Sequence, residues 1–164
     1  MVTLTRWIDR LTQQVVTLQP VVTDGMLRDP VESKLALSRD FMALMALDHP
    51  HIVKVLDFGI DDHEQPYFVL EAADHAEGFI EAARRAPPSI QKNFVAQLLG
   101  ALGYLHRRDL VHGHLTPAHL RVTVGQLKLF VLGSAALPGP TQDEQFMAPE
   151  LRRGQPPSAV SDLW

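Results

Sequence analysis

The most constraining feature of this sequence is a histidine-rich stretch, followed by a short apolar segment and a glycine-ended triplet. The stretch is His112–Leu120 (HGHLTPAHL), and the triplet is Val131–Gly133 (VLG). Between them, Leu120–Val122 places an arginine between two apolar residues, which is typical of a strand whose side chains alternate between two faces. The sequence therefore predicts a polar loop, then a strand, then the triplet, within one short segment.

The composition is that of an ordinary globular protein. The chain has 164 residues, 46% of them hydrophobic and 21% charged, which is enough for one domain with a real core. A net charge of −4 provides no basic field for nucleic acid or an anionic membrane surface. The absence of cysteine excludes disulfides and thiolate metal sites. No apolar run approaches the roughly 18 residues that a membrane helix needs. The start of the chain lacks a signal peptide's apolar core. We therefore expect a cytoplasmic protein.

The stretch and the triplet resemble two motifs of protein kinases. The catalytic loop of that family reads H-R-D-L-x-x-x-N, and D-F-G follows after a strand. Four other segments resemble family motifs in the family's order, so the resemblance covers nearly the whole chain. These segments are 48–53 (DHPHIV, similar to S-H-P-N-I-V), 102–106 (LGYLH, similar to L-x-Y-L-H), 145–150 (QFMAPE, similar to Y-M-A-P-E) and 161–164 (SDLW, similar to S-D-x-W).

The resemblance to eukaryotic-type serine/threonine kinases implies an α+β, two-lobe fold that is incomplete at both ends. Residues 1–73 would form the small lobe and hinge, and residues 74–164 part of the large lobe. The first strand and the glycine-rich loop would precede Met1, because the chain contains no G-x-G-x-x-G. The central helix of the large lobe would begin at Asp162, whose carboxylate would hydrogen-bond the backbone of the catalytic loop.

Local patterns predict the secondary structure. Two short runs, Val2–Thr5 and Val15–Leu18, flank a polar turn and predict a hairpin. Apolar residues at three- and four-residue spacing over 32–47 predict an amphipathic helix, and residues 52–58 and 67–71 predict two strands. A second helix is expected from the N-cap Ser89 to about Arg107. Its expected apolar face comprises Phe94, Leu98, Leu99, Leu102 and Leu105.

In the small lobe, the resemblance places two altered residues at positions that bind phosphate in active kinases. Gln19 stands at the lysine that grips the α- and β-phosphates, and Asp40 stands at the glutamate that pairs with this lysine. A neutral amide cannot neutralise phosphate. In place of an ion pair, at best one hydrogen bond worth about 1 kcal/mol would join Gln19 to Asp40.

In the large lobe, four matched positions are also altered. His114 replaces the base aspartate, and Thr116 replaces a second phosphate-facing lysine. His119 and Val131 replace the asparagine and aspartate that hold magnesium. Mg²⁺ prefers hard oxygen ligands, which neither imidazole nor valine supplies. The substitutions predict that the catalytic residues of the family are degenerate here and that no cofactor is bound.

The resemblance also outlines a vestigial nucleotide cleft. Thr17 would replace the small residue of its roof, Leu70 would stand at the gatekeeper, and Glu71 and Ala73 would lie in the hinge. Arg121 would replace the apolar floor under the adenine ring and point at the nucleotide position. A one-residue slip in the alignment would instead place Arg121 on the surface.

Histidines of the central stretch raise the alternative of a metal site. His114 and His119 replace two residues that face the cleft, and their imidazoles are weak candidates for binding a soft cation. Two imidazoles make only half of a zinc site, and no third ligand is evident. The resemblance implies that His112 packs inward beneath the loop, as a core histidine.

Together these observations predict a pseudokinase that is not an enzyme and that acts as a scaffold or allosteric protein-binding module. The alternative is a nucleotide-binding or weakly active serine/threonine kinase-like enzyme. Without its central helix the large lobe would leave the inner face of Phe94–Leu105 uncovered. A protein partner, the remainder of a longer chain or a second copy of this chain would then cover it. No nucleic acid or membrane partner is expected.

Overall fold

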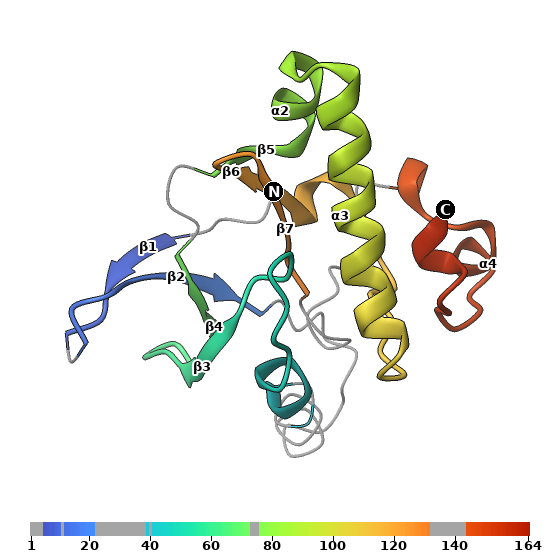
Figure 1. The fold of residues 1–164 in the computed structure, drawn as a ribbon. Coiled ribbons are helices and arrows are strands. Elements are labelled where there is room, and N and C mark those ends of the chain that lie inside the picture. Colours follow the sequence, from blue (N-terminus) through green and yellow to red (C-terminus); the bar gives the residue numbers. More distant parts are fainter. Residues whose placement is uncertain (1–4, 11, 22–38, 40, 73–75, 132–143) are drawn as a thin grey trace. The chain divides into compact units, whose positions relative to one another are not determined.

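Figure 1 shows the computed structural model, which describes residues 5–10, 12–21, 39, 41–72, 76–131 and 144–164. These residues divide into two compact units. The first unit contains the described residues up to 48 and those of 53–72, and the second contains 49–52, 76–131 and 144–164. The mixed α+β architecture agrees with the prediction. Within the described residues, no helix is long and apolar enough to cross a membrane.

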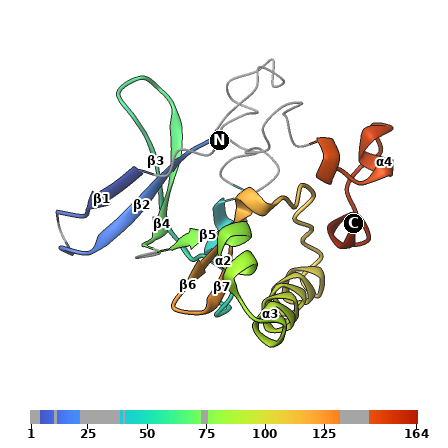
Figure 2. The ribbon, with the colours of Figure 1, turned by 90° about the horizontal axis from the view of Figure 1, so that it is seen from above.

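The first unit is built on an antiparallel sheet of four strands in the order β1-β2-β4-β3 (Figure 2). The strands are β1 (Thr5–Ile8), β2 (Val15–Pro20), β3 (Val55–Ile60) and β4 (Pro66–Glu71). Residues 41–45 are helical, within the predicted helix over 32–47. Residues 22–38 and Asp40 lie outside the described part of the chain.

The predicted hairpin at the start of the chain is confirmed, but its first strand, described over Thr5–Ile8, continues past the predicted end at Thr5. Residues 2–4 lie outside the described part of the chain. The tight turn sets this register. Gln13 adopts a φ of 58°, its N–H donates to the Asp9 carbonyl at 2.8 Å, and the Asp9 N–H donates to Gln14 at 2.9 Å. Pairing therefore begins beside the turn, where Ile8 faces Val15.

Aromatic side chains fill the core of the first unit. The rings of Phe41, Phe58 and Phe68 lie with centroids 5.7, 6.4 and 5.9 Å apart. The strand predicted over 52–58 begins only at Val55, because Ile52 instead bridges Leu129 in the second unit. The strand predicted over 67–71 is confirmed as β4.

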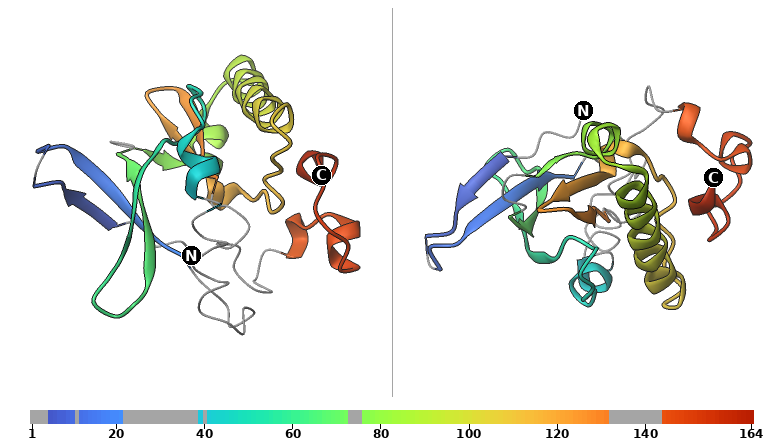
Figure 3. Two further views of the ribbon diagram at one scale, coloured as in Figure 1. Left: turned by 90° about the horizontal axis from the view of Figure 1, so that it is seen from below. Right: turned by 45° about the horizontal axis from the view of Figure 1, so that its top comes forward.

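The second unit contains an antiparallel three-stranded sheet in the order β5-β6-β7, and the hairpin β6–β7 lies beside α3 (Figure 3). Its elements are β5 (Glu77–Gly78), α2 (Phe79–Arg85), α3 (Pro88–His106), η1 (Pro117–His119), β6 (Leu120–Thr123), β7 (Gln126–Leu129), η3 (Glu144–Phe146), α4 (Pro149–Arg152) and η4 (Ser161–Leu163). Strand β5 and helix α2 are not predicted from the sequence, because two and seven residues are too few to show a clear period.

Helix α3 begins two residues earlier than predicted, since an N-cap at Ser89 would make Ile90 the first helical residue. Its N-cap is Pro87 and Pro88 is its first residue, so the expected N-cap role of Ser89 is wrong. Proline suits the first helical position because its φ is already helical and its missing N–H would have no partner there.

The prediction that the inner face of α3 is uncovered is also wrong for most of that face. Phe94, Leu102 and Leu105 are buried, because β7 and the ring of Phe79 pack in the same unit. The Phe79 and Phe94 centroids are 6.2 Å apart. Leu99, expected on this face, is 51% exposed, and Val95 beside it is 53% exposed.

Candidate functional site

Hydrogen bonds of the His112 ring anchor the start of the loop that runs from His112 to His119. The His112 side chain is buried, and its Nε2–H donates to the Phe130 carbonyl at 3.0 Å. Its Nδ1 accepts from the His114 N–H at 3.4 Å. Burial lowers the pKa of His112, although the Phe130 bond and nearby Asp162 oppose the shift. The ring is thus a neutral core histidine, as predicted.

Asp162 holds the same loop from another side. Its buried carboxylate accepts from the backbone N–H of His112 at 2.9 Å and of Gly113 at 2.7 Å. His106, the last residue of α3, places Nε2 2.8 Å from the same carboxylate. The predicted contact between Asp162 and the loop backbone is confirmed. The contribution of His106 was missed, because 56 residues separate it from Asp162.

Glycine is required at position 113. Its φ is +77°, which a residue with a side chain rarely adopts, and a Cβ there would lie 3.2 Å from Pro157. The missing side chain lets the loop turn close beneath Asp162, so that both carboxylate oxygens reach backbone N–H groups.

His119 and Thr116 form a buried pair at the end of the loop. Thr116 Oγ1 lies 3.2 Å from His119 Nδ1, and both side chains are buried. Burial, followed by the neighbouring His112 and His114, lowers the pKa of His119 to about 3, against an opposing hydrogen bond to the His114 backbone. His119 is therefore neutral near pH 7, and its Nδ1 is engaged by the threonine. The three-residue spacing of this pair was a signal available in the sequence.

These residues do not fit a magnesium ion. Mg²⁺ takes hard oxygen ligands, whereas His119 offers an imidazole already bonded to Thr116, and Val131 offers no donor atom. The His114 and His119 ring centroids lie 6.1 Å apart. Over the described ranges, no three His, Cys, Asp or Glu side chains form a group that could hold a metal.

Gln19 lies in a different setting, on β2 of the first unit. Its side chain is only 3% exposed, and its Oε1 has no hydrogen-bond partner among the described residues. Gln19 stands opposite Phe68 in the sheet register. An amide oxygen is an acceptor, as phosphate oxygens are, so this buried atom is suited to a donor and not to phosphate.

The other predicted cleft residues divide between the sheet and the undescribed part of the chain. Leu70 is buried on β4 opposite half-buried Thr17, and Glu71 ends the same strand. Ala73 and Asp40 lie outside the described residues. The proposed roles of these side chains around a nucleotide stay predictions.

Arg121 supports the loop through its side chain. It lies on β6 between the buried Leu120 and Val122, so the predicted alternation is confirmed. Its Nη1 donates to the carbonyls of Ala118 and Leu120, each at 3.3 Å. The guanidinium therefore folds back on the end of the catalytic loop, and its predicted contact with a nucleotide stays untested.

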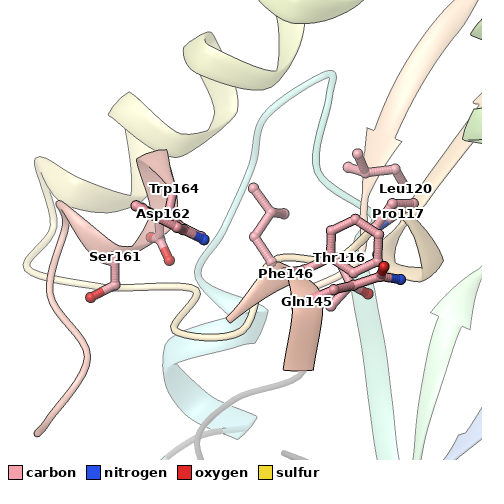
Figure 4. Close-up of a pocket in the computed structure, with 9 residues that line it drawn as sticks. Thr116, Pro117, Leu120, Gln145, Phe146, Ser161, Asp162 and Trp164 are labelled. Atoms are coloured by element: carbon pink, nitrogen blue, oxygen red, sulfur yellow. The ribbon is translucent and has the colours of Figure 1, made fainter. Parts of the chain in front are cut away.

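A pocket of about 210 Å³ opens beside the loop, within the second unit. Figure 4 shows Thr116, Pro117 and Leu120 on one side and Ser161, Asp162 and Trp164 on the other. Next to it, Ser161 Oγ donates to Glu150 Oε1 at 2.7 Å, and this bond lowers the pKa of Glu150. The pocket combines apolar walls with a few buried polar groups.

Comparison with known proteins identifies this arrangement. The family description "protein kinase domain" matches residues 11–164. The chain belongs to the protein kinase family. It is 29% identical over 165 residues to the serine/threonine-protein kinase ULK3 of Homo sapiens, covering 93% of this chain and 34% of that protein. It is 31% identical over 172 residues to a probable serine/threonine-protein kinase of Streptomyces coelicolor, covering 94% of this chain and 25% of that protein. The chain thus spans about a third or less of the length of these relatives.

These matches confirm the recognised family and the partial kinase fold, and they overturn one prediction. The expectation that the chain is not an enzyme is wrong, because the kinase domain match and relatives named as serine/threonine-protein kinases point to an enzyme. The loop that carries the altered residues also keeps its frame, which His112 and Asp162 hold in place.

Proposed function

We propose that this chain is part of a cytoplasmic serine/threonine-protein kinase that transfers a phosphoryl group slowly. The observation that carries the proposal is the support of the catalytic loop by Asp162 and His112. Asp162 accepts from the backbone N–H groups of His112 and Gly113, and the His112 ring accepts from the backbone N–H of His114. A supported loop of this kind positions a catalytic side chain, and positioning is a large part of phosphoryl-transfer catalysis.

His114 is the residue we assign as proton acceptor. Its side chain is half-buried, and imidazole is the commonest general base in enzymes. In the proposed step, the hydroxyl oxygen of a substrate serine or threonine bonds to the γ-phosphorus of ATP. The bond from that phosphorus to ADP breaks, and the hydroxyl proton passes to His114. The neutral, buried His119 and His112 are not positioned to take that proton.

The rate is expected to be low, because the groups that neutralise phosphate charge in the family are replaced. Neither His119 nor Val131 is suited to magnesium. Gln19 cannot neutralise phosphate either. Removing a single electrostatic donor of a transition state costs typically ~10²–10³ in turnover, so a weakly active enzyme is what this set of residues supports.

The pocket beside the loop is suited to a side chain of a polypeptide substrate. At about 210 Å³ it is smaller than typical small-molecule sites of roughly 300–1,000 Å³. Leu115, Pro117 and Phe146 supply apolar walls, and Gln145 supplies a polar group. Phe146 is 40% exposed, so an extended peptide could add to its contacts.

The test is transfer of radiolabelled γ-phosphate from ATP to serine- and threonine-containing peptides, measured against heat-denatured protein. We expect incorporation above that control and a loss of about 10²-fold or more in His114→Ala, the contribution of a positioned base. His63→Ala is the matched control, since His63 is an exposed histidine in the β3–β4 turn and should leave the rate unchanged. Equal rates in the wild type and His114→Ala, or no incorporation at all, would contradict the proposal.

A second candidate function is protein binding. Val95 and Leu99 form an exposed apolar stripe on α3, each about half exposed. Exposed apolar patches commonly mark interaction sites. A protein partner, a second copy or a further part of the same polypeptide would each cover the stripe. Light scattering on Leu99→Lys and wild type tests the second copy: self-association predicts a wild-type dimer that the variant loses, and a monomer in both contradicts self-association.

A further inference from the structure

A cluster of basic and aromatic side chains lies at the C-terminal end of α3, apart from His114 and His119. We call it the basic cluster and define it by His49, His51, Tyr104, Arg107 and Arg108. All five belong to the second unit. The chain carries a net charge of −4, so a concentration of positive groups is unusual for it.

Close contacts hold the aromatic members of the cluster together. The His49 ring centroid is 5.0 Å from that of Tyr104 and 5.6 Å from that of His51. The Arg108 guanidinium carbon lies 3.6 Å from the centre of the Tyr104 ring. Arg108 Nη1 also donates to the Tyr104 carbonyl at 3.4 Å. The stacking fixes the planar guanidinium near His49, and its remaining N–H donors are well suited to phosphate oxygens.

Hydrogen bonds determine which nitrogen atoms the imidazoles present. The backbone N–H of His51 donates to His49 Nδ1 at 3.2 Å, so the neutral His49 ring carries its proton on Nε2. His51 Nδ1 lies 3.1 Å from the Leu127 carbonyl and donates to it. His49 therefore offers an Nε2–H donor, while its other nitrogen is engaged.

Several positive groups act on the His49 imidazole. Burial lowers the pKa of His49, and His51, Arg107, Arg108 and Lys128 lower it further. Basic residues at a helix C-terminus stabilise the helix dipole, which accounts for the arginines but not for two imidazoles held beside them.

We propose that the basic cluster is a phosphate-binding site, with Arg107, Arg108 and His49 Nε2 as donors. The ligand chemistry is a phosphate dianion, either free or as the phosphorylated side chain of a protein. Such an anion would accept charge-assisted hydrogen bonds from the arginines and offset the repulsion among the positive groups. The site is separate from the proposed kinase reaction and does not depend on it.

The experiment follows the histidine side-chain resonances of residues 1–164 by NMR at constant ionic strength. One arm adds inorganic phosphate, a second adds a phosphoserine peptide, and a third adds the same peptide unphosphorylated. We expect a saturable shift of the His49 resonances and a rise in its pKa, because the anion offsets the neighbouring charges. Saturation by inorganic phosphate identifies free phosphate as sufficient, and saturation by the phosphopeptide alone identifies a phosphorylated side chain.

Two double variants distinguish a specific phosphate-binding site from general attraction of the anion to positive charge. Arg107→Gln with Arg108→Gln should weaken binding about tenfold or more, the effect of losing a charge-assisted hydrogen bond. Arg84→Gln with Arg85→Gln removes the same charge from the end of α2 and should leave binding unchanged. If the double variant unfolds, binding is measured instead with Arg107→Gln alone, which keeps the stacked Arg108. An unmoved His49 resonance in both phosphate arms, equal weakening in the two double variants, or equal binding of the unphosphorylated peptide would overturn the proposal.

Discussion

The catalytic loop and the Gln19 position differ in how each accommodates a buried polar side chain where the family has another residue. In the loop, His119 is bonded to Thr116, and the loop backbone is bonded to Asp162. On β2, the Oε1 atom of Gln19 has no partner among the described residues. Both side chains are at most 4% exposed, so burial alone does not distinguish them.

The difference shows that a replaced residue can enter a local hydrogen-bond network or stay unsatisfied, with opposite effects on stability. An unsatisfied buried acceptor costs about 1–3 kcal/mol, whereas a satisfied one contributes modestly. The loop has therefore kept a defined structure despite its altered residues. The Gln19 position retains a cost that the described structure does not offset.

The largest expected effect comes from removing Asp162. Asp162→Ala would leave the N–H groups of His112 and Gly113 and the His106 ring without their acceptor. At about 1–3 kcal/mol for each unsatisfied group, we expect a loss of about 5 kcal/mol in the free energy of unfolding. Denaturant titration measures it, with the exposed Asp62→Ala as control. A loss below about 1 kcal/mol would mean that the loop does not depend on this carboxylate.

The second effect is the pH dependence that His119 imposes. Its pKa is about 3 in the folded state and 6.5 in the unfolded reference, so the unfolded chain binds the proton more readily between those values. Stability from this group is complete above pH 6.5 and is lost as the pH falls towards 3, by roughly 4 kcal/mol. His112, whose pKa is also lowered, acts in the same direction.

The check is the unfolding free energy between pH 7 and pH 4 in wild type and His119→Asn. The variant should lose much of the slope, while the exposed His63→Asn should keep all of it. If the His119 variant has the same pH dependence as wild type, the histidine is not held neutral by burial.

The sequence predicted the fold well where a pattern is long or a motif is specific. The α+β class, the hairpin, the strand β4 and the buried role of His112 are all confirmed, because periodicity and motif order determine them. Predictions were poorer at element ends. Pro87 and not Ser89 is the N-cap of α3, and the first strand continues past Thr5 to Ile8, because each boundary depends on one local backbone choice.

At the candidate site, the sequence identified the right loop but not its bonds. The contact from Asp162 to the loop was expected from the resemblance, whereas His106 joins the same carboxylate from 56 residues away and no local pattern indicates it. Whether Gln19 Oε1 finds a hydrogen-bond donor depends on which side chains surround it. The spacing of residues in the sequence does not reveal those neighbours. The conclusion that the altered residues together exclude an enzyme is wrong, because the kinase domain match and the relatives named as serine/threonine-protein kinases point to an enzyme.

A smaller effect separates backbone strain from crowding in the loop. Gly113→Ala places a side chain at φ +77° with its Cβ 3.2 Å from Pro157, whereas Gly125→Ala has φ +74° and open space. We expect Gly125→Ala to lose about 1 kcal/mol from strain and Gly113→Ala to lose about 2 kcal/mol or more from strain plus crowding. Denaturant titration of both variants measures the difference, and equal losses would show that Pro157 moves aside freely.

The smallest expected effect, and the only gain, is at Gln19. Gln19→Met keeps the volume of the side chain and removes the unpartnered oxygen, so we expect a stabilisation of about 1 kcal/mol. Gln14→Met, at an exposed residue beside β2, should change stability by less than about 0.5 kcal/mol. Thermal and denaturant unfolding of the two variants measure the effect. Destabilisation by Gln19→Met would mean that the amide oxygen has a partner in the folded protein, and the contrast drawn here between β2 and the catalytic loop would then be wrong.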